Sequence, residues 1–251
     1  LVSYLKFPSV STDSHYKENV RGCAEWLSSK IDEVGLEASI HETPGHPIVI
    51  GKNKHSEDKP TVMIYGHYDV QPADPIDLWD SPPFEPLIKD GKIYARGSTD
   101  NKGQHLAHLL GLGETLSENG DLPVNIIYLV EGEEEIGSPN LEPFLIENKE
   151  DLACDVIAVS DTGMIGPGMG TFTYGLRGVA CMEVKVIGPS KDLHSGVFGG
   201  AVANPCTAIA KMISSLHDLD GRIKVGGFYD RVKEIEDWEK TAWAKIQINE
   251  N

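Results

Sequence analysis

The chain has 251 residues, of which 40% are hydrophobic, so it can bury the core of one large domain or two ordinary ones. Its formal net charge of -17 argues against a nucleic-acid or anionic-membrane partner, because both require a basic face. The four cysteines are far apart without a CxxC pair, which argues against a cysteine-based zinc site and suits a reducing compartment. No apolar run approaches the roughly 20 residues of a membrane span, so we expect a cytoplasmic protein.

Strand and helix signals alternate through the first 160 residues. Apolar residues at helical spacing predict a helix from about Ser14 to Val34, and Gly35 ends it. Short strands are expected over 36–40 and 48–50, buried strands over 61–65, 124–130 and 155–159, and helices over 103–119 and about 139–149. The proline-rich segment 71–92 is expected to be a long loop. This alternation predicts an α/β fold with a central, mostly parallel sheet flanked by helices.

The pattern changes after Asp161. A glycine-rich connector leads into a run of alternating character over 180–187, which predicts a strand, and residues 205–216 have the spacing of a helix. We therefore expect a first domain over 1–175 and the beginning of a second over 176–251.

Three of the predicted buried strands are followed by imidazole or carboxylate side chains. His67 and Asp69 follow the first, Glu134 and Glu135 follow the second, and Asp161 follows the third. Ligands of open α/β sheets bind beyond the carboxyl ends of the strands, so these residues describe one site.

A neutral imidazole surrounded by carboxylates is the ligand set of a divalent metal such as zinc or manganese. Asp100, in a glycine-flanked loop before a helix, is suited to bridge two ions. The adjacent Glu134 and Glu135 would point in different directions from a turn, and Asp69 can hold the imidazole of His67.

Each of these residues also has a plainer interpretation. A single histidine after a strand is more often packed or solvated, and a run such as EGEEE is usually a solvated acidic turn. Like charges clustered at a strand end favour a bound cation when the residues are taken together. His105 and His108 are expected to be packing or surface residues, and the chain has neither a GxSxG nor an HExxH motif.

Four blocks resemble the M20 family of metallopeptidases, in particular its dipeptidase branch: YGHYDVQPA (65–73), WDSPPFEPLIKDGKIYARGSTDNKG (79–103), EGEEEIGS (131–138) and GPSKDLHSGVFGGAVANP (188–205). The resemblance implies a catalytic α/β domain with an inserted α+β lid through which two copies dimerise. It also implies two divalent metal ions, zinc first and manganese or cobalt as alternatives. His67 and Asp161 would bind one ion, Glu135 the second, and Asp100 both.

The same resemblance implies a reaction. Asp69 would be the catalytic aspartate behind His67, and Glu134 the general base that takes a proton from a water held between the metals as it attacks the peptide bond of a dipeptide. His194, in DLHSG, would reach the partner subunit's active site and stabilise the oxyanion. The family's second-metal histidine has no counterpart here, so we expect the second metal to be weakly held or absent. An N-acyl-amino-acid deacylase and a non-catalytic dimerising module remain alternatives.

Overall fold

The computed structural model describes residues 1–246 and divides into two compact units, unit 1 (Leu1–Met164) and unit 2 (Ile165–Asn251). Among the helices of the described residues, none combines the length and the apolar character needed to cross a bilayer.

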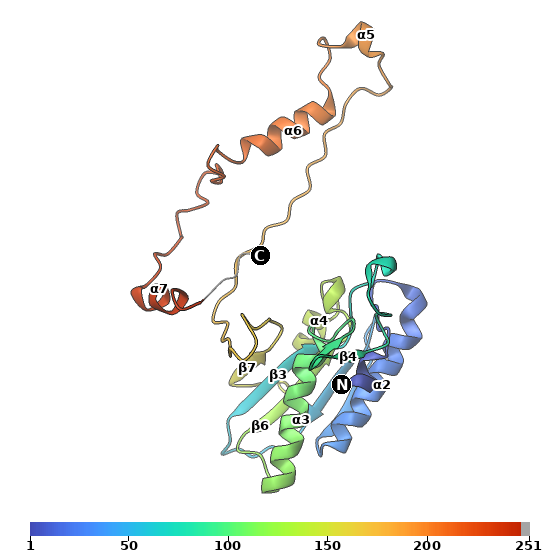
Figure 1. Ribbon diagram of the computed structural model, residues 1–251, viewed down its shortest axis with the longest axis vertical. Coiled ribbons are helices and arrows are strands. Elements are labelled where there is room, and N and C mark those ends of the chain that lie inside the picture. The colour runs from blue at the N-terminus through green and yellow to red at the C-terminus, as the bar shows by residue number, and fades with distance from the viewer. Residues whose placement is uncertain (247–251) are drawn as a thin grey trace. The chain divides into compact units, whose positions relative to one another are not determined.

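Unit 1 is built on a five-stranded sheet with the order β1-β2-β6-β3-β7 (Figure 1). Its strands are β1 (Glu37–His41), β2 (Ile48–Lys52), β3 (Thr61–His67), β6 (Asn125–Glu131) and β7 (Val156–Val159). Strands β6, β3 and β7 are parallel, whereas β1 and β2 are antiparallel to their neighbours. The predicted α/β fold with its mostly parallel central strands is confirmed.

Helices cover both faces of this sheet. Helices α2 (Lys17–Glu33) and α3 (Lys102–Asn119) contribute Leu27 and Leu109 to one apolar core, while α4 (Leu141–Glu147) contributes Phe144 to the core on the other face. The seven residues of β6 are all buried, which explains why this strand is apolar without alternation. Gly35, with a φ of 94°, follows α2 in a conformation that glycine adopts at little cost.

Shorter elements connect these layers. They are α1 (Val2–Leu5) and the 3₁₀ turns η1 (Ser14–Tyr16), η2 (Ile76–Leu78) and η3 (Glu134–Ile136). The segment 71–92, expected to be a long loop, contains η2 and β4 (Leu87–Lys89) and ends at the first residue of β5 (Lys92–Tyr94), with which β4 forms a hairpin. The sequence missed this hairpin because each of its strands has three residues, too few for a periodic signal.

Unit 2 contains α5 (Ser195–Phe198), α6 (Pro205–Ser215) and α7 (Asp237–Trp243). Helix α6 matches the prediction, and the Asn204 side chain caps it by accepting a hydrogen bond from the Cys206 amide at 2.8 Å. The strand predicted over 180–187 is wrong, since no regular structure forms there and nearly all its side chains are exposed. Alternating character cannot make a strand without a hydrogen-bonding neighbour, and no described segment pairs with this one.

Candidate metal centre

The carboxyl ends of the parallel strands meet at one edge of the sheet. His67, the last residue of β3, pairs in register with Glu131, the last residue of β6. Strand β7 runs parallel to β3 on its other side, and Asp161 follows two residues after its end. Residues that are far apart in the chain therefore converge at this edge.

His67 lies at the centre of the cluster. Its side chain is fully buried, and its Nε2 atom lies 3.2 Å from Asp100 Oδ1 and 3.4 Å from Asp161 Oδ2. Neither carboxylate is placed to hydrogen-bond this nitrogen, which has no partner among the described residues. A buried polar atom left without a partner costs about 1–3 kcal/mol. One nitrogen and two carboxylates facing a common point fit a divalent metal such as zinc.

The electrostatics of the cluster favour a positive charge at the same place. Burial disfavours the imidazolium, but the carboxylates of Asp161 and Asp69 outweigh burial and raise the pKa of His67 to about 11. The close approach of the His67 ring to Asp161 Oδ2 in turn lowers the pKa of Asp161. A cation bound between these side chains would satisfy the carboxylates as a proton on His67 does.

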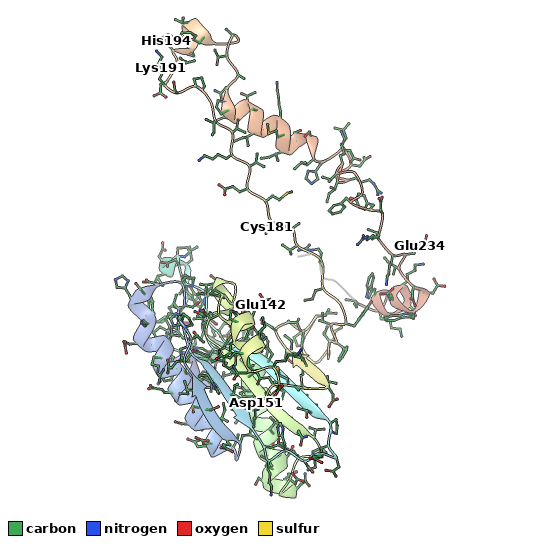
Figure 2. All side chains as sticks on the ribbon, turned by 180° about the vertical axis from the view of Figure 1, so that it is seen from behind. Glu142, Asp151, Cys181, Lys191, His194 and Glu234 are labelled. Carbon is green, nitrogen blue, oxygen red and sulfur yellow. The ribbon has the colours of Figure 1, made fainter. Side chains whose placement is uncertain are left out.

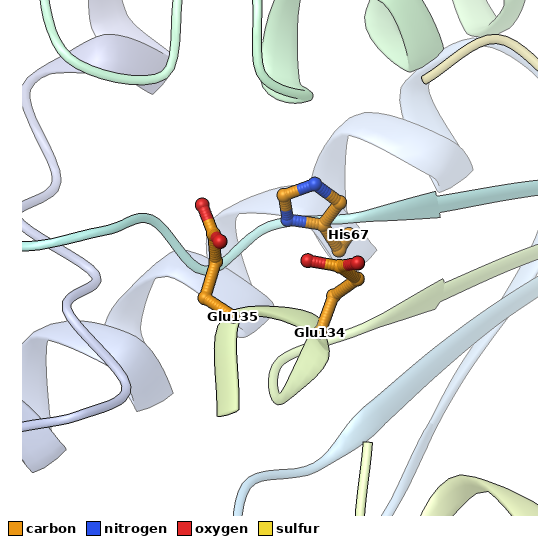
Figure 3. Close-up of side chains that lie close together, drawn as sticks. All are labelled: His67, Glu134 and Glu135. Carbon is orange, nitrogen blue, oxygen red and sulfur yellow. The ribbon is translucent and has the colours of Figure 1, made fainter. Parts of the chain in front are cut away.

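Glu134 and Glu135 lie beside His67 at the start of η3 (Figure 3). One oxygen of each carboxylate and one ring nitrogen of His67 all lie within 4.8 Å of one another. The two carboxylates thus face the same imidazole, unlike the diverging directions expected from the sequence. Successive side chains of a 3₁₀ turn project about 120° apart, yet the carboxylates of Glu134 and Glu135 both reach toward the His67 ring.

The two glutamates differ in what holds them. Glu135 accepts hydrogen bonds from the backbone N–H of Gln71 at 3.2 Å and from the side-chain Nε2 of Gln71 at 2.7 Å. No hydrogen bond within residues 1–246 holds the carboxylate of Glu134. Burial first, and nearby carboxylates second, raise the pKa of Glu134 above its ordinary value. Burial raises the pKa of Glu135 as well. The two glutamates therefore differ in their hydrogen bonds, and Glu134 is the carboxylate with more freedom.

Asp69 is fully buried and connects the imidazole to the glutamate turn. Its Oδ1 atom lies 3.4 Å from His67 Nδ1, although the Asp69 carbonyl oxygen is nearer to that nitrogen, at 3.1 Å. The Asp69 carboxylate also accepts the backbone N–H of Glu134 at 3.3 Å and that of Glu135 at 3.1 Å. One carboxylate thereby fixes the positions of three neighbouring residues.

Asn101 is a member of the site that the sequence did not reveal. This buried side chain accepts a hydrogen bond from the His67 amide at 3.2 Å. Its Nδ2 atom donates to the Ser160 carbonyl and to Asp161 Oδ1, each at 3.3 Å. Its only signal in the sequence is its position next to Asp100, since asparagine before a helix usually reads as a cap.

Two other glutamates of the acidic run 131–135 are buried. Glu131 is 1% exposed and accepts hydrogen bonds from the Tyr65 hydroxyl at 2.6 Å and the Ser138 hydroxyl at 2.8 Å. Glu133 is 4% exposed and accepts from the His46 amide at 3.0 Å and from Asn140 Nδ2 at 2.7 Å. A fully solvated acidic turn is therefore excluded for this segment.

The remaining histidines considered in the sequence lie in different settings. His105 is buried and packs between the hydroxyls of Tyr4 and Tyr128, and His108 Nε2 lies 2.6 Å from the Ser160 hydroxyl. His194 belongs to unit 2, where it precedes α5 with an exposed side chain (Figure 2). Its Nδ1 atom accepts a hydrogen bond from the Gly196 amide at 3.0 Å.

Comparisons with known proteins identify relatives of this chain. The profile of peptidase family M20/M25/M40 matches residues 63–239. The chain is 36% identical to the Cys-Gly metallodipeptidase dug1 of Schizosaccharomyces pombe over 256 residues, which cover 96% of this chain and 54% of the relative. The chain therefore spans about half the length of that relative.

Two solved structures are similar over nearly the whole chain. The M20 family metallo-carboxypeptidase Sso-CP2 from Sulfolobus solfataricus is 35% identical with a TM-score of 0.79, covering 99% of this chain and 56% of its own. Human carnosine dipeptidase 1 is 30% identical with a TM-score of 0.77, covering 98% of this chain and 55% of its own.

Proposed function

The chain belongs to peptidase family M20/M25/M40, and from that premise we propose that it carries the metal centre of an enzyme that hydrolyses the peptide bond of dipeptides. The observation that carries the proposal is the buried Nε2 atom of His67, which faces two carboxylates without a hydrogen bond. A buried ring nitrogen without a hydrogen-bond partner is costly in a folded protein, and a divalent cation that took the place of the imidazolium proton would relieve that cost.

The family resemblance implies how the ligands would be shared. We assign His67, Asp100 and Asp161 to one metal ion, and Asp100 with Glu135 to the second. An imidazole among carboxylates favours zinc, and manganese or cobalt would also suit these donors. Gln71 contributes by holding Glu135 through two hydrogen bonds.

The chain's own groups then account for proton transfer. Bound divalent metal would supply Lewis acidity, polarising the peptide carbonyl and making a water more acidic. Glu134 accepts the proton of the attacking water and returns it to the leaving amine, and its raised pKa increases the proton affinity that this exchange requires. Asp69 keeps the His67 ring in place from the Nδ1 side, so that Nε2 stays directed at the cluster.

His194 has the chemistry of an oxyanion donor. Because Nδ1 of the neutral ring accepts the Gly196 N–H, the proton of the ring resides on Nε2, which can donate to a developing negative charge. We assign it this role in the active site of a partner subunit. The assignment goes with a catalytic domain over 1–175 and the first part of a dimerising lid over 176–251.

Dipeptides are the favoured substrates because relatives at 36% and 30% identity are named for Cys-Gly and carnosine hydrolysis. Because one of the similar structures is a carboxypeptidase, longer peptides are the substrates against which dipeptides should be compared. We retain the cytoplasm as the compartment, where the four unpaired cysteines would stay reduced.

The test is zinc-dependent release of amino acids from a panel of dipeptides, tripeptides and N-acyl amino acids. Glu134→Gln should bind zinc as the wild type does and lose at least about 100-fold in turnover, because it cannot accept a proton. Asp100→Ala should lose zinc binding in addition to turnover. Hydrolysis of N-acyl amino acids alone would indicate a deacylase, and zinc-bound protein inactive on the whole panel would indicate a non-catalytic module.

A further inference from the structure

Residues 4–11, here called the N-terminal strap, run beside the segment that follows β3. Val10 and Val70 form a parallel β-bridge, and the Val70 amide donates to the Ser9 carbonyl at 2.9 Å. The Ser9 hydroxyl donates to the Tyr68 carbonyl at 2.6 Å. The strap is therefore joined by backbone and side-chain hydrogen bonds to the residues on either side of Asp69.

A buried lysine fixes the other end of the strap. Lys102 is fully buried at the start of α3, two residues after Asp100, and its ammonium donates to the Phe7 carbonyl at 2.9 Å. The same ammonium lies 5.1 Å from the centre of the Tyr4 ring. Because a buried ammonium needs such partners, these contacts tie the strap to the helix that begins beside the metal centre.

Ser11 is the strap residue that contacts the site. Its hydroxyl is 2.6 Å from Asp69 Oδ2, the distance of a hydrogen bond to an ionised carboxylate, and the residue is 8% exposed. The other neighbours of the Asp69 carboxylate are the amides of Glu134 and Glu135 and the ring of His67. Ser11 is thus the contact that fixes this carboxylate from outside the centre.

We propose that Ser11 is a positioning residue of the metal centre. Its hydroxyl holds the Asp69 carboxylate in the one orientation that receives both glutamate amides and lies against His67. The effect on metal binding passes through Asp69 and rests on the proposed function, whereas the effect on the glutamate turn needs no metal.

The metal-free chain gives the first test. Amide hydrogen exchange at Glu134 and Glu135 reports whether Asp69 still accepts their N–H groups. In Ser11→Ala, exchange at these two amides should be about tenfold faster than in the wild type, while the amide of Ile127 within β6 should be unchanged. Unchanged exchange at both glutamates would overturn the proposal.

Zinc affinity, measured by competition with a chromophoric chelator, gives the second test. Ser11→Thr and Ser11→Val have nearly the same shape and differ in the hydroxyl, so they form a matched pair even if Ser11→Ala folds poorly. Ser11→Thr should bind zinc within about twofold of the wild type, and Ser11→Val about tenfold more weakly. Ser9→Ala, which removes a strap hydroxyl that does not touch Asp69, is the control and should bind normally.

Equal affinities of the threonine and valine variants would refute the role of the hydroxyl. An equal loss in Ser9→Ala would show that docking of the strap, rather than the contact of Ser11 with Asp69, is what matters, and would also overturn the proposal. If the wild-type chain binds no zinc, the proposed metal centre fails, yet hydrogen exchange still decides the role of Ser11.

Discussion

Gly66 immediately precedes His67, and adding a methyl group there should disturb both the fold and the site. A Cβ atom at Gly66 would lie 2.7 Å from His105 Cβ and 2.8 Å from Asn101 Oδ1. Neither neighbour can move freely, because the hydroxyls of Tyr4 and Tyr128 hold His105, and the His67 amide and Asp161 hold Asn101.

The expected cost of Gly66→Ala follows from these contacts. Overpacking of a rigid core costs about 1–3 kcal/mol. Displacing Asn101 removes its hydrogen bond to the His67 amide, which adds about 1 kcal/mol. We therefore expect the free energy of unfolding to fall by about 2–4 kcal/mol in urea titrations followed by circular dichroism. Zinc affinity should fall at least about tenfold, because Asn101 also holds Asp161.

Gly111→Ala is the matched control for this substitution. Gly111 lies within α3, and a Cβ atom there would meet nothing within 4 Å. Alanine should stabilise the helix by about 0.5–1 kcal/mol and leave zinc affinity unchanged. If Gly66→Ala proved as stable as the wild type, with unchanged zinc affinity, the packing described for Asn101 and His105 would be incorrect.

Three further predictions concern metal and pH. Calorimetry should detect one tight zinc ion and a second that binds at least about tenfold more weakly, because His67 is the sole imidazole in the metal-ligand clusters of residues 1–246; two equally tight ions would contradict this. Free zinc at about 100 times its dissociation constant should stabilise the chain by about 2.7 kcal/mol, and EDTA should reverse the gain; an unchanged melting temperature would argue against a site formed in the folded state. Burial raises the pKa of Glu131, so its contribution to the stability of the metal-free chain is complete below its ordinary value of 4.5 and is lost as the pH rises through the folded-state pKa. Glu131→Gln should therefore lose less stability than the wild type as the pH rises above 4.5, and an equal loss in both proteins would refute this assignment.

The local sequence was sufficient for the five strands of the main sheet of unit 1, for the helices that flank it and for the place where the site would form, but not for the β4–β5 hairpin. Apolar runs such as those of β3 and β6 carry their own signal, and parallel strands bring their carboxyl ends to one edge. The convergence of His67, Asp100 and Asp161 was accordingly anticipated from strand ends and residue types.

Tertiary structure decided what surrounds those residues. Asn101 lies 34 residues from His67 in the chain, and Ser11 lies 58 residues from Asp69, so neither contact has a periodic or local signature. The inward direction of Glu131 and Glu133 likewise depends on donors from other segments. The alternating run over 180–187 has the local pattern of a strand but forms none, because a strand requires a neighbouring strand that local character cannot supply.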